Sequence, residues 1–569
     1  MEYFKKFNSV LTSKEKKYFL ILLILSIFGS ILELIGISLI FPLLDVLVDQ
    51  NNLNKYGFLN KIIFFNINEL NKNNIVSYLL ISISLIYIFR TFYLIFLNYF
   101  QNSYTVMVRS RITFEIYSKN ILNNFIFFSS RDNSEIMRNI ISEAGQFIKG
   151  VLNQVLILLL EVCLFIGLIF FLFTINFKTT SIIIIIFGIV GFLYFTLLRR
   201  KVRVLGHERN KSQTALLKNL INSVKNFIDI RVFEKEKLFS KNFLDSLNLL
   251  LNNLKKLSII QSATRHIIEL IIILIFVTGI ALFYQNLTKH YTDILFSFVI
   301  IVRIYPAFTK IISSLNTIMY SKESINNVYN EISKKELKLK NENEIESIKN
   351  ISLKNINFKF LNSDKNTLDN LSILFENNKS YGIFGNSGSG KTTLLNVLSG
   401  ILDPNSGNIL INDKLVQYNE INWRKRVSYV SQNPFFLNDT IQYNISFKNH
   451  LDANEKLKLT KSIQFSKLEE FMSKNIIDYN YIIGEDGSKL SGGQRQRLGI
   501  ARAIYKEADL YIFDEATSGI DEKTEISLIN DLKANLKDKI LIFISHNKNI
   551  MDLCDEIYEL KDQKLIQSK

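Results

Sequence analysis

The chain has 569 residues, 48% of them hydrophobic, which is too long and too apolar for one soluble domain and predicts a membrane protein that carries a soluble domain. Its two cysteines, Cys163 and Cys554, exclude a disulfide framework. The formal net charge of +16 would suit a nucleic-acid-binding protein. However, the basic residues cluster beside apolar segments, so they indicate a cytoplasmic membrane face and no nucleic-acid partner.

Six apolar segments are long enough to cross a bilayer, for which about 20 residues are needed. They span roughly residues 19–48, 75–99, 151–175, 181–198, 267–284 and 294–315. The first has no small-residue cleavage site, which predicts a retained helix rather than a signal peptide. Lysine and arginine are dense before the first segment and in the long second and fourth connections. The turns 176–178 and 285–293 carry one lysine each. Both termini are therefore expected to be cytoplasmic.

Charged residues inside these segments are functional candidates, because a charge in a membrane is costly unless it is paired or hydrated. They are Glu33, Arg90, Glu161, Arg265, Glu269, Arg303 and Lys310. A purely structural alternative is pairing. Arg265 and Glu269 have the i,i+4 spacing of a pair on one helix. Glu33 and Arg90 could likewise pair between neighbouring helices.

The sixth segment carries the most informative of these charges. Arg303 and Lys310 are seven residues apart, which places them on one helix face, and no acidic residue lies between them. With Arg90 and Arg265 they predict a basic substrate cavity. Such a cavity suits an anionic substrate, for example a phosphate or pyrophosphate headgroup.

The two long connections are expected to be helical and to carry the membrane helices into the cytoplasm. Residues 1–320 are thus predicted to form the transmembrane domain. The polar, charge-rich segment 321–350 is predicted to be a linker, and residues 351–569 a second domain.

The first sequence motif in the second domain that indicates a function is a phosphate-binding loop. Residues 385–392 fit G-x-x-x-x-G-K-[ST], and they lie between a predicted strand, 380–384, and a predicted helix, 393–398. Glycines let backbone N–H groups surround phosphates at a helix N-terminus. Lys391 is expected to reach the β- and γ-phosphates, and Thr392 to bind Mg²⁺. The predicted ATP-binding residues here are Gly385, Asn386, Ser387, Gly388, Ser389, Gly390, Lys391, Thr392 and Thr393.

Acidic residues end the next apolar strand, 510–515. Adjacent carboxylates repel unless a cation or nucleotide uses them, so Asp514 is expected to hold Mg²⁺ and Glu515 to polarise the attacking water. His546 follows a further apolar strand, 540–545, and is expected to contact the γ-phosphate. An isolated histidine at a strand end is more often structural, but here it follows a phosphate loop and an Asp-Glu pair.

The segment 490–494, L-S-G-G-Q, resembles the signature loop of ABC ATPases, and the whole chain resembles the half-transporter type of ABC exporter. This resemblance implies a six-helix transmembrane bundle with long cytoplasmic helix extensions, fused to a C-terminal α/β phosphate-loop ATPase domain. It also implies that the loop docks on ATP held by a second ATPase domain, which predicts a homodimer; a heterodimer with a sister chain stays open. The signature residues are Ser491, Gly492, Gly493 and Gln494.

Further site residues come from the same resemblance. Gln432 lies in a segment like the family's Q-loop, which implies a contact with Mg²⁺ and the attacking water. Phe360 stands where an aromatic residue, more often tyrosine, stacks on adenine. Residues 518–521 resemble the D-loop, with Gly519 where alanine is more usual. Short segments around 127–132 and 230–234 resemble the helices that couple the two domains.

Three membrane motifs, at residues 33–42, 89–90 and 303–306, resemble the PglK-type flippases for lipid-linked oligosaccharides. That likeness implies a polyprenyl-pyrophosphate-linked glycan as substrate and the inner membrane of a bacterium as location. An exporter of another lipid, a peptide or a hydrophobic compound would share every ATPase motif and stays an alternative. An ABC ATPase of DNA repair or translation is a weaker one, since it would not need six membrane segments.

Overall fold

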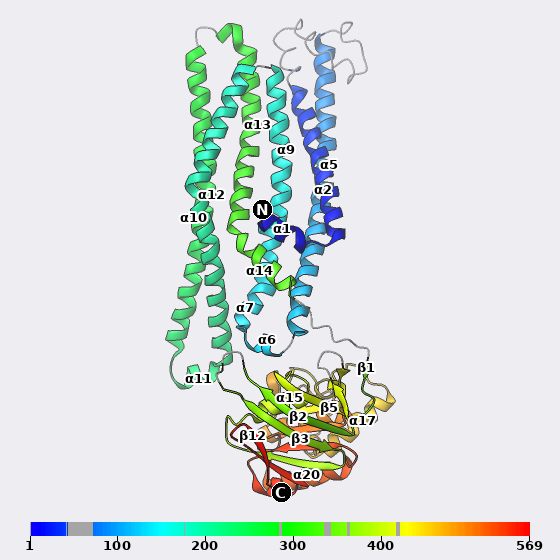
Figure 1. Cartoon of the computed structure of the whole chain (residues 1–569). Coiled ribbons are helices and arrows are strands. Elements are labelled where there is room, and N and C mark those ends of the chain that lie inside the picture. The colour runs from blue at the N-terminus through cyan, green and yellow to red at the C-terminus, as the bar shows by residue number, and fades with distance from the viewer. Residues whose placement is uncertain are drawn as a thin grey trace. The chain divides into compact units, whose positions relative to one another are not determined.

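The computed structural model describes residues 2–40, 43, 72–123, 125–175, 177–283, 287–334, 343–360, 363, 365–416 and 421–568. The chain divides into two compact units (Figure 1). The helical unit contains Met1–Leu122 and Ser129–Lys335, and the sheet unit contains Asn123–Phe128 and Glu336–Lys569. A short segment from the first half of the chain thus belongs to the sheet unit.

The helical unit is built from long helices joined by short ones. In chain order they are α1 (Glu2–Val10), α2 (Ser13–Ser38), α5 (Lys72–Ile121), α7 (Asn133–Met137), the π-helix η3 (Arg138–Glu143), α8 (Ala144–Phe147), the π-helix η4 (Ile148–Leu152), α9 (Asn153–Ile175), α10 (Phe177–Lys225), α11 (Phe227–Val232), α12 (Glu236–Phe283), α13 (Leu287–Tyr320) and α14 (Lys322–Ile332).

Three of these helices are much longer than a bilayer is thick. α5, α10 and α12 have 50, 49 and 48 residues. At about 1.5 Å per residue each spans roughly 75 Å, against about 30 Å of hydrocarbon. The long connections are therefore helical, as expected. Within the described residues, four helices are long and apolar enough to cross a membrane. The other two predicted spans lie in α10 and α13, which include side chains outside that description.

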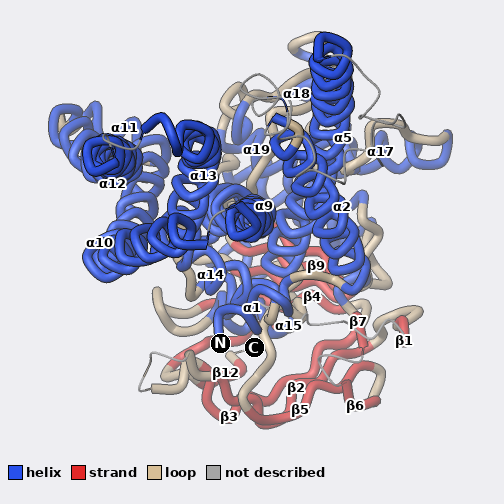
Figure 2. The backbone as a smooth tube through the Cα atoms, turned by 90° about the horizontal axis from the view of Figure 1, so that it is seen from above, coloured by secondary structure: helices blue, strands red, loops and turns tan. Residues whose placement is uncertain are grey.

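Apolar side chains from distant parts of the chain pack these helices together. One buried cluster joins Leu164 and Leu168 of α9 to Ile268 of α12 and Ile304 of α13. Viewed along the helix axes, α10 and α12 lie on one side of α9 and α13, and α2 and α5 lie on the other (Figure 2). A second cluster joins α2, α5 and η4 to α14. The segment expected to be a linker therefore begins with a helix that packs into the helical unit.

The sheet unit holds two main sheets and a set of helices. Its helices are α6 (Phe125–Ser129), α15 (Lys391–Leu398), η6 (Arg424–Arg426), α16 (Ile441–Ser446), α17 (Ala453–Phe465), α18 (Glu469–Lys474), η7 (Glu485–Gly487), α19 (Gly492–Tyr505), α20 (Glu522–Asn535) and α21 (Lys548–Asp552). Its strands are β1 (Asn343–Glu344), β2 (Asn350–Phe358), β3 (Leu368–Glu376), β4 (Lys379–Phe384), β5 (Ser406–Ile411), β6 (Lys414–Val416), β7 (Ile421–Asn422), β8 (Val427–Val430), β9 (Leu510–Asp514), β10 (Ile540–Ile544), β11 (Glu556–Lys561) and β12 (Lys564–Gln567).

The larger sheet has the order β12-β11-β4-β10-β9-β8, and its strands are parallel except for β12 at the edge. Every residue of β10 is buried, as expected for a central parallel strand covered on both faces. The smaller antiparallel sheet has the order β3-β2-β5-β6. One core cluster joins the two sheets to α15 and also contacts Ile126 of α6. The predicted α/β domain is thus present, and the parallel strands place their carboxyl ends side by side.

Candidate active site

The predicted catalytic residues follow four neighbouring strands of the parallel sheet. The phosphate loop follows β4, Asp514 ends β9, His546 follows β10, and Gln432 follows β8. Ligands of open parallel sheets bind at the carboxyl ends of the strands. The strand order therefore gathers residues that are more than 100 positions apart in the sequence.

The phosphate loop has the backbone shape that wraps an anion. Gly388 and Gly390 have φ angles of +79° and +106°, in the left-handed region. A Cβ on Gly390 would lie 2.7 Å from the carbonyl oxygen of Thr367, so only glycine fits there. Gly390 is also the N-cap of α15, which begins at Lys391. The positive end of this helix faces the loop.

The side chains of the loop fit a bound triphosphate. Nζ of Lys391 donates to the carbonyl oxygens of Gly385 (2.6 Å) and Asn386 (3.1 Å), so it lies folded across the loop. Oγ of Ser389 is buried and makes no hydrogen bond within the described structure, and a phosphate oxygen would satisfy it. Thr392 is exposed in the first turn of α15, whereas Thr393 is only 7% exposed. Thr393 is therefore largely buried, in contrast to Thr392.

Glu515 lies at the centre of the catalytic group. Nε2 of Gln432 donates to one of its carboxylate oxygens at 2.5 Å, and Nε2 of His546 lies 3.2 Å from the other. The backbone of Glu515 has φ of +48°, a left-handed conformation that costs a non-glycine residue energy. Its N–H donates to the carbonyl oxygen of Ile544 in β10 at 3.0 Å. Two strands thus fix the residue that is expected to polarise water.

Asp514 is held by a residue that sequence reasoning missed. The hydroxyl of Tyr429, in β8, donates to Oδ2 of Asp514 at 2.8 Å. Burial is the main reason why the pKa of Asp514 is raised, and the negative charge of Glu515 adds to the shift. A divalent cation would offset both effects, and the carboxylate, hydroxyl and amide oxygens of Asp514, Thr392 and Gln432 are the donors that Mg²⁺ prefers. Tyr429 could have been recognised only from the pairing of β8 with β9, which the sequence alone does not show.

The signature loop caps the helix that follows it. Oγ of Ser491 accepts from the N–H of Gln494 (3.3 Å), and Oε1 of Gln494 accepts from the N–H of Ser491 (2.8 Å). The side chain of Gln494 is thus engaged inside its own helix, α19. Gly492 has open space where a Cβ would point, while a Cβ on Gly493 would lie 2.9 Å from the carbonyl oxygen of Gly519. Ser491 and Gly492 are therefore the exposed part of the loop.

A second missed residue joins the signature helix to the D-loop. Gln496 of α19 is buried, and its Nε2 donates to Oγ of Ser518 at 3.1 Å. Its Oε1 accepts from the N–H of Gly519 at 2.8 Å. Phe360 lies apart from this group, with its ring edge-on to Phe358 at 4.9 Å between centroids and 37% exposed. The ring of Phe360 is therefore partly exposed.

In the predicted membrane segments, two of the four predicted cavity cations, Arg90 and Lys310, form ion pairs with carboxylates. Nη2 of Arg90 lies 3.1 Å from Oε1 of Glu33, so the pairing alternative holds there. Nζ of Lys310 donates to Oε1 of the buried Glu161 at 2.6 Å. No acidic residue lies between Arg303 and Lys310 in the sequence, and the acidic partner of Lys310 comes from α9 and not from its own helix.

Arg265 lies at a cavity of about 330 Å³ between α12 and α13. The alternative pair with Glu269 is not among the ion pairs of the described side chains; Glu269 lies 3.7 Å from Nδ1 of His266 instead. Lys310 lines the same cavity, together with the polar side chains of Gln261, Thr264, Tyr305, Thr309, Ser313 and Asn316. The backbone of Arg303 lies in α13, but its side chain is outside the described structure.

Comparison with known proteins matches both units. The family profile described as "ABC transporter transmembrane region" matches residues 19–318, and the one described as "ABC transporter" matches residues 368–518. A solved structure of a bacterial Atm1-family ABC exporter with ATP bound superposes with a TM-score of 0.78 at 16% identity, over 97% of this chain and 95% of that one. The fold class predicted from the sequence is therefore confirmed.

Curated relatives match either most of the chain or a part of it. The heterocyst differentiation ATP-binding protein HepA of Nostoc sp. is 26% identical over 503 residues, which is 85% of this chain and 80% of that protein. The ATP-dependent lipid A-core flippase of Francisella tularensis is 25% identical over 485 residues, 83% of this chain and 78% of that one. The corresponding flippase of Vibrio parahaemolyticus is 34% identical over 218 residues, 38% and 37% of the two chains.

Proposed function

Because the chain belongs to the ABC transporter family and is an ATP-driven exporter, we propose that it flips a polyprenyl-pyrophosphate-linked oligosaccharide from the cytoplasmic to the outer leaflet. We place it in a bacterial inner membrane with both termini in the cytoplasm. The basic loops between the predicted spans support that orientation. The lipid A-core flippases among its relatives support a lipid as the class of substrate.

The observation that carries the substrate proposal is the cavity between α12 and α13. Arg265 and Lys310 both line it, and Arg265 forms no ion pair within the described structure. A guanidinium binds phosphate oxygens through two parallel hydrogen bonds, whereas an ammonium acts as a point charge. The cavity has hydroxyl and amide groups as well, which suit a pyrophosphate and the first sugar. The Glu161 partner of Lys310 reduces the positive charge, so Arg265 becomes the principal anchor.

The ATP site supplies the energy. When bound, ATP with Mg²⁺ provides the phosphoryl bond whose hydrolysis drives the cycle. Lys391 would exchange its two carbonyl partners for phosphate oxygens. Glu515, oriented by Gln432 and His546, would position water and accept its proton. Asp514 and Thr392 would hold Mg²⁺, and Phe360 would stack on adenine.

We also propose a homodimer with two shared ATP sites. Ser491 and Gly493 of one copy would complete the site that Lys391 and Glu515 form in the other. The signature loop supports this arrangement, because Ser491 and Gly492 are exposed in the single chain and are therefore accessible to a second copy. Closed two-fold symmetry is the commonest way to complete such an assembly.

The test is transport by purified protein in liposomes. ATP-dependent loss of a labelled polyprenyl-pyrophosphate glycan from the outer face of inside-out vesicles is expected, with no movement of a labelled phospholipid. Arg265→Ala should abolish glycan movement while ATPase activity persists. The matched control is His266→Ala, because His266 neighbours Arg265, is 74% exposed and does not line the cavity. Transport of a lipid A-core glycolipid but not of the polyprenyl glycan would replace the proposed substrate, and transport of neither would reject this class.

A further inference from the structure

The chain passes between its two units at three points. It leaves the helical unit after Leu122, returns at Ser129, and leaves again after Lys335. The first two crossings enclose α6, whose Ile126 contacts the core of the sheet unit. Everything that the sheet unit transmits to the helical unit through the chain must pass these points.

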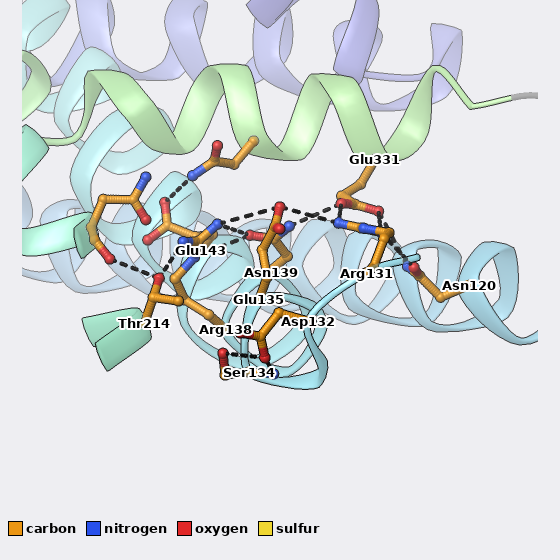
Figure 3. Close-up of polar contacts among 12 residues, drawn as sticks. Asn120, Arg131, Asp132, Ser134, Glu135, Arg138, Asn139, Glu143, Thr214 and Glu331 are labelled. Carbon is orange, nitrogen blue, oxygen red and sulfur yellow. Dashed lines mark hydrogen bonds and ion pairs between the residues drawn. The ribbon is translucent and has the colours of Figure 1, made fainter. Parts of the chain in front are cut away.

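The carboxylate of Glu331 gathers residues from all three crossings. Figure 3 shows Asn120 and Arg131 beside it. Asn120, just before the first, donates to Oε2 at 3.2 Å. Arg131, just after the second, donates to Oε1 at 2.6 Å and to Oε2 at 3.3 Å. Lys334, just before the third, donates to Oε2 at 2.6 Å. Glu331 itself lies near the end of α14, the last helix before the third crossing.

The centre of this cluster is buried, because Glu331, Asn120 and Asn139 are each 3% exposed. Arg131 also donates to Oδ1 of Asn120 at 2.8 Å, and Asn139 of η3 donates to Oε1 of Glu331 at 2.9 Å. Burial alone would raise the pKa of Glu331, but the hydrogen bonds from Arg131 and Lys334 outweigh it and lower the pKa to about 2. The carboxylate is therefore charged and fully used, and such a network holds its members in one geometry.

A second pair of contacts extends the cluster toward another long helix. Nδ2 of Asn327, one turn earlier in α14, donates to Oε2 of Glu143 at 3.3 Å. The buried Glu143 accepts in turn from Arg209 of α10 at 2.9 Å. Through Asn120 and Arg209, α14 is thus connected to both α5 and α10, two of the long helices that carry predicted membrane spans.

We propose that Glu331 is a positioning residue that couples ATP hydrolysis to movement of the membrane helices. By holding the three crossings in one cluster, it makes them move as one body when the ATPase domains change state. Without it, α14 and the segment around α6 would shift independently, and the energy of hydrolysis would not reach the substrate cavity. This role does not depend on which substrate is transported.

The test measures ATPase rate and cavity movement in the same nanodisc sample. A reporter, Thr309→Cys, which lines the cavity, is placed in a chain with Cys163→Ser and Cys554→Ala. Its labelling by a water-soluble maleimide is timed with and without ATP and vanadate. ATP with vanadate is expected to change the labelling rate by about fivefold or more. In Glu331→Gln the ATPase rate should persist, while this change is lost.

The matched control is Glu15→Gln. Glu15 and Glu331 are both 3% exposed, and each has an arginine nitrogen at 2.6 Å, from Arg111 and Arg131 respectively. Both variants should lower the melting temperature, but Glu15→Gln should keep the nucleotide-dependent labelling change. Equal loss of that change in both variants, or its retention in Glu331→Gln, overturns the proposal. If Glu331→Gln does not fold, Arg131→Lys, which keeps the charge but loses the two-pronged contact, should reduce the change; an unchanged response overturns the proposal.

Discussion

The two units of this transporter use charged residues in opposite ways. In the ATPase domain, Nζ of Lys391 donates to two backbone carbonyls and Asp514 accepts from a neutral tyrosine, so among the described contacts neither has an oppositely charged partner. In the membrane region, Arg90 and Lys310 are already neutralised by Glu33 and Glu161. A charge at the end of a parallel strand is therefore a strong sign of function, whereas a charge inside a membrane helix first has to be tested for a partner.

The largest expected effect lies in the ATPase domain. Glu515→Gln should retain ATP binding and lower the hydrolysis rate by about 10²–10⁴-fold, because an amide cannot accept a proton from water. The ATP-bound closed dimer should accumulate. Hydrolysis is measured by phosphate release and binding by nucleotide retention on the purified protein. Turnover close to wild type would remove Glu515 from the role proposed here.

The dimer proposal predicts complementation between damaged chains. Lys391→Ala in one chain and Ser491→Arg in the other place both lesions in one ATP site and leave the second intact, so a mixed dimer should retain measurable ATPase activity. A dimer with both lesions in each chain should have none. The assay uses two affinity tags to purify the mixed dimer. A mixed dimer as inactive as the doubly damaged one would count against shared sites.

Nucleotide-dependent crosslinking is a second test of whether two chains share each ATP site. A cysteine in place of Ser387 and another in place of Ser491 should crosslink between chains when ATP is bound. Both residues are exposed in the single chain, so each can reach a second copy. Crosslinks that form only within one chain would contradict the shared site.

The sequence predicted a site well where the interacting residues are close together in the chain, and poorly where they come from distant helices. The phosphate loop and the signature loop are contiguous, so their residues were identified together and their backbone shapes followed from glycine positions. Gln432, Asp514 and His546 meet because the strand order brings their strands together. Glu161 and Lys310 are 149 residues apart on different helices, and no local pattern joins them. Side-chain pairing across a bundle depends on helix rotation and register, which hydropathy does not specify.

If Arg303 and Lys310 bind the substrate as proposed, their loss should stop transport even where hydrolysis survives. Arg303→Ala should lose glycan flipping more severely than Arg303→Lys, because only the second keeps a positive charge. Expression and basal ATPase activity should stay near wild type in both variants. Flipping and ATPase activity are measured in the same proteoliposomes. Flipping at the wild-type rate in both Arg303→Ala and Lys310→Ala would make an apolar or peptide substrate the better interpretation.

Breaking the Lys310–Glu161 pair should have a smaller effect, and this effect is on stability. Lys310→Met should leave the buried Glu161 without its partner and lower the melting temperature. The cost should be well under the about 3–5 kcal/mol of a fully buried pair, because the lysine side chain is 58% exposed. Adding Glu161→Gln should restore most of the loss. If the two losses add instead, the residues do not act as a pair.

The smallest expected effect concerns Tyr429, which brings the comparison back to the ATPase domain. Tyr429→Phe removes only the hydroxyl that donates to Asp514 at 2.8 Å. A hydrogen bond to a charged group contributes about 1.5–3 kcal/mol, of which a bound Mg²⁺ would replace a part. The Mg²⁺ concentration for half-maximal ATPase activity should therefore rise by about tenfold or less, with the maximal rate nearly unchanged. Ser428→Ala is the control, since the buried Ser428 bonds to the carbonyl of Ala503 and not to the site. An unchanged Mg²⁺ dependence in Tyr429→Phe would mean that Asp514 is positioned by its strand alone.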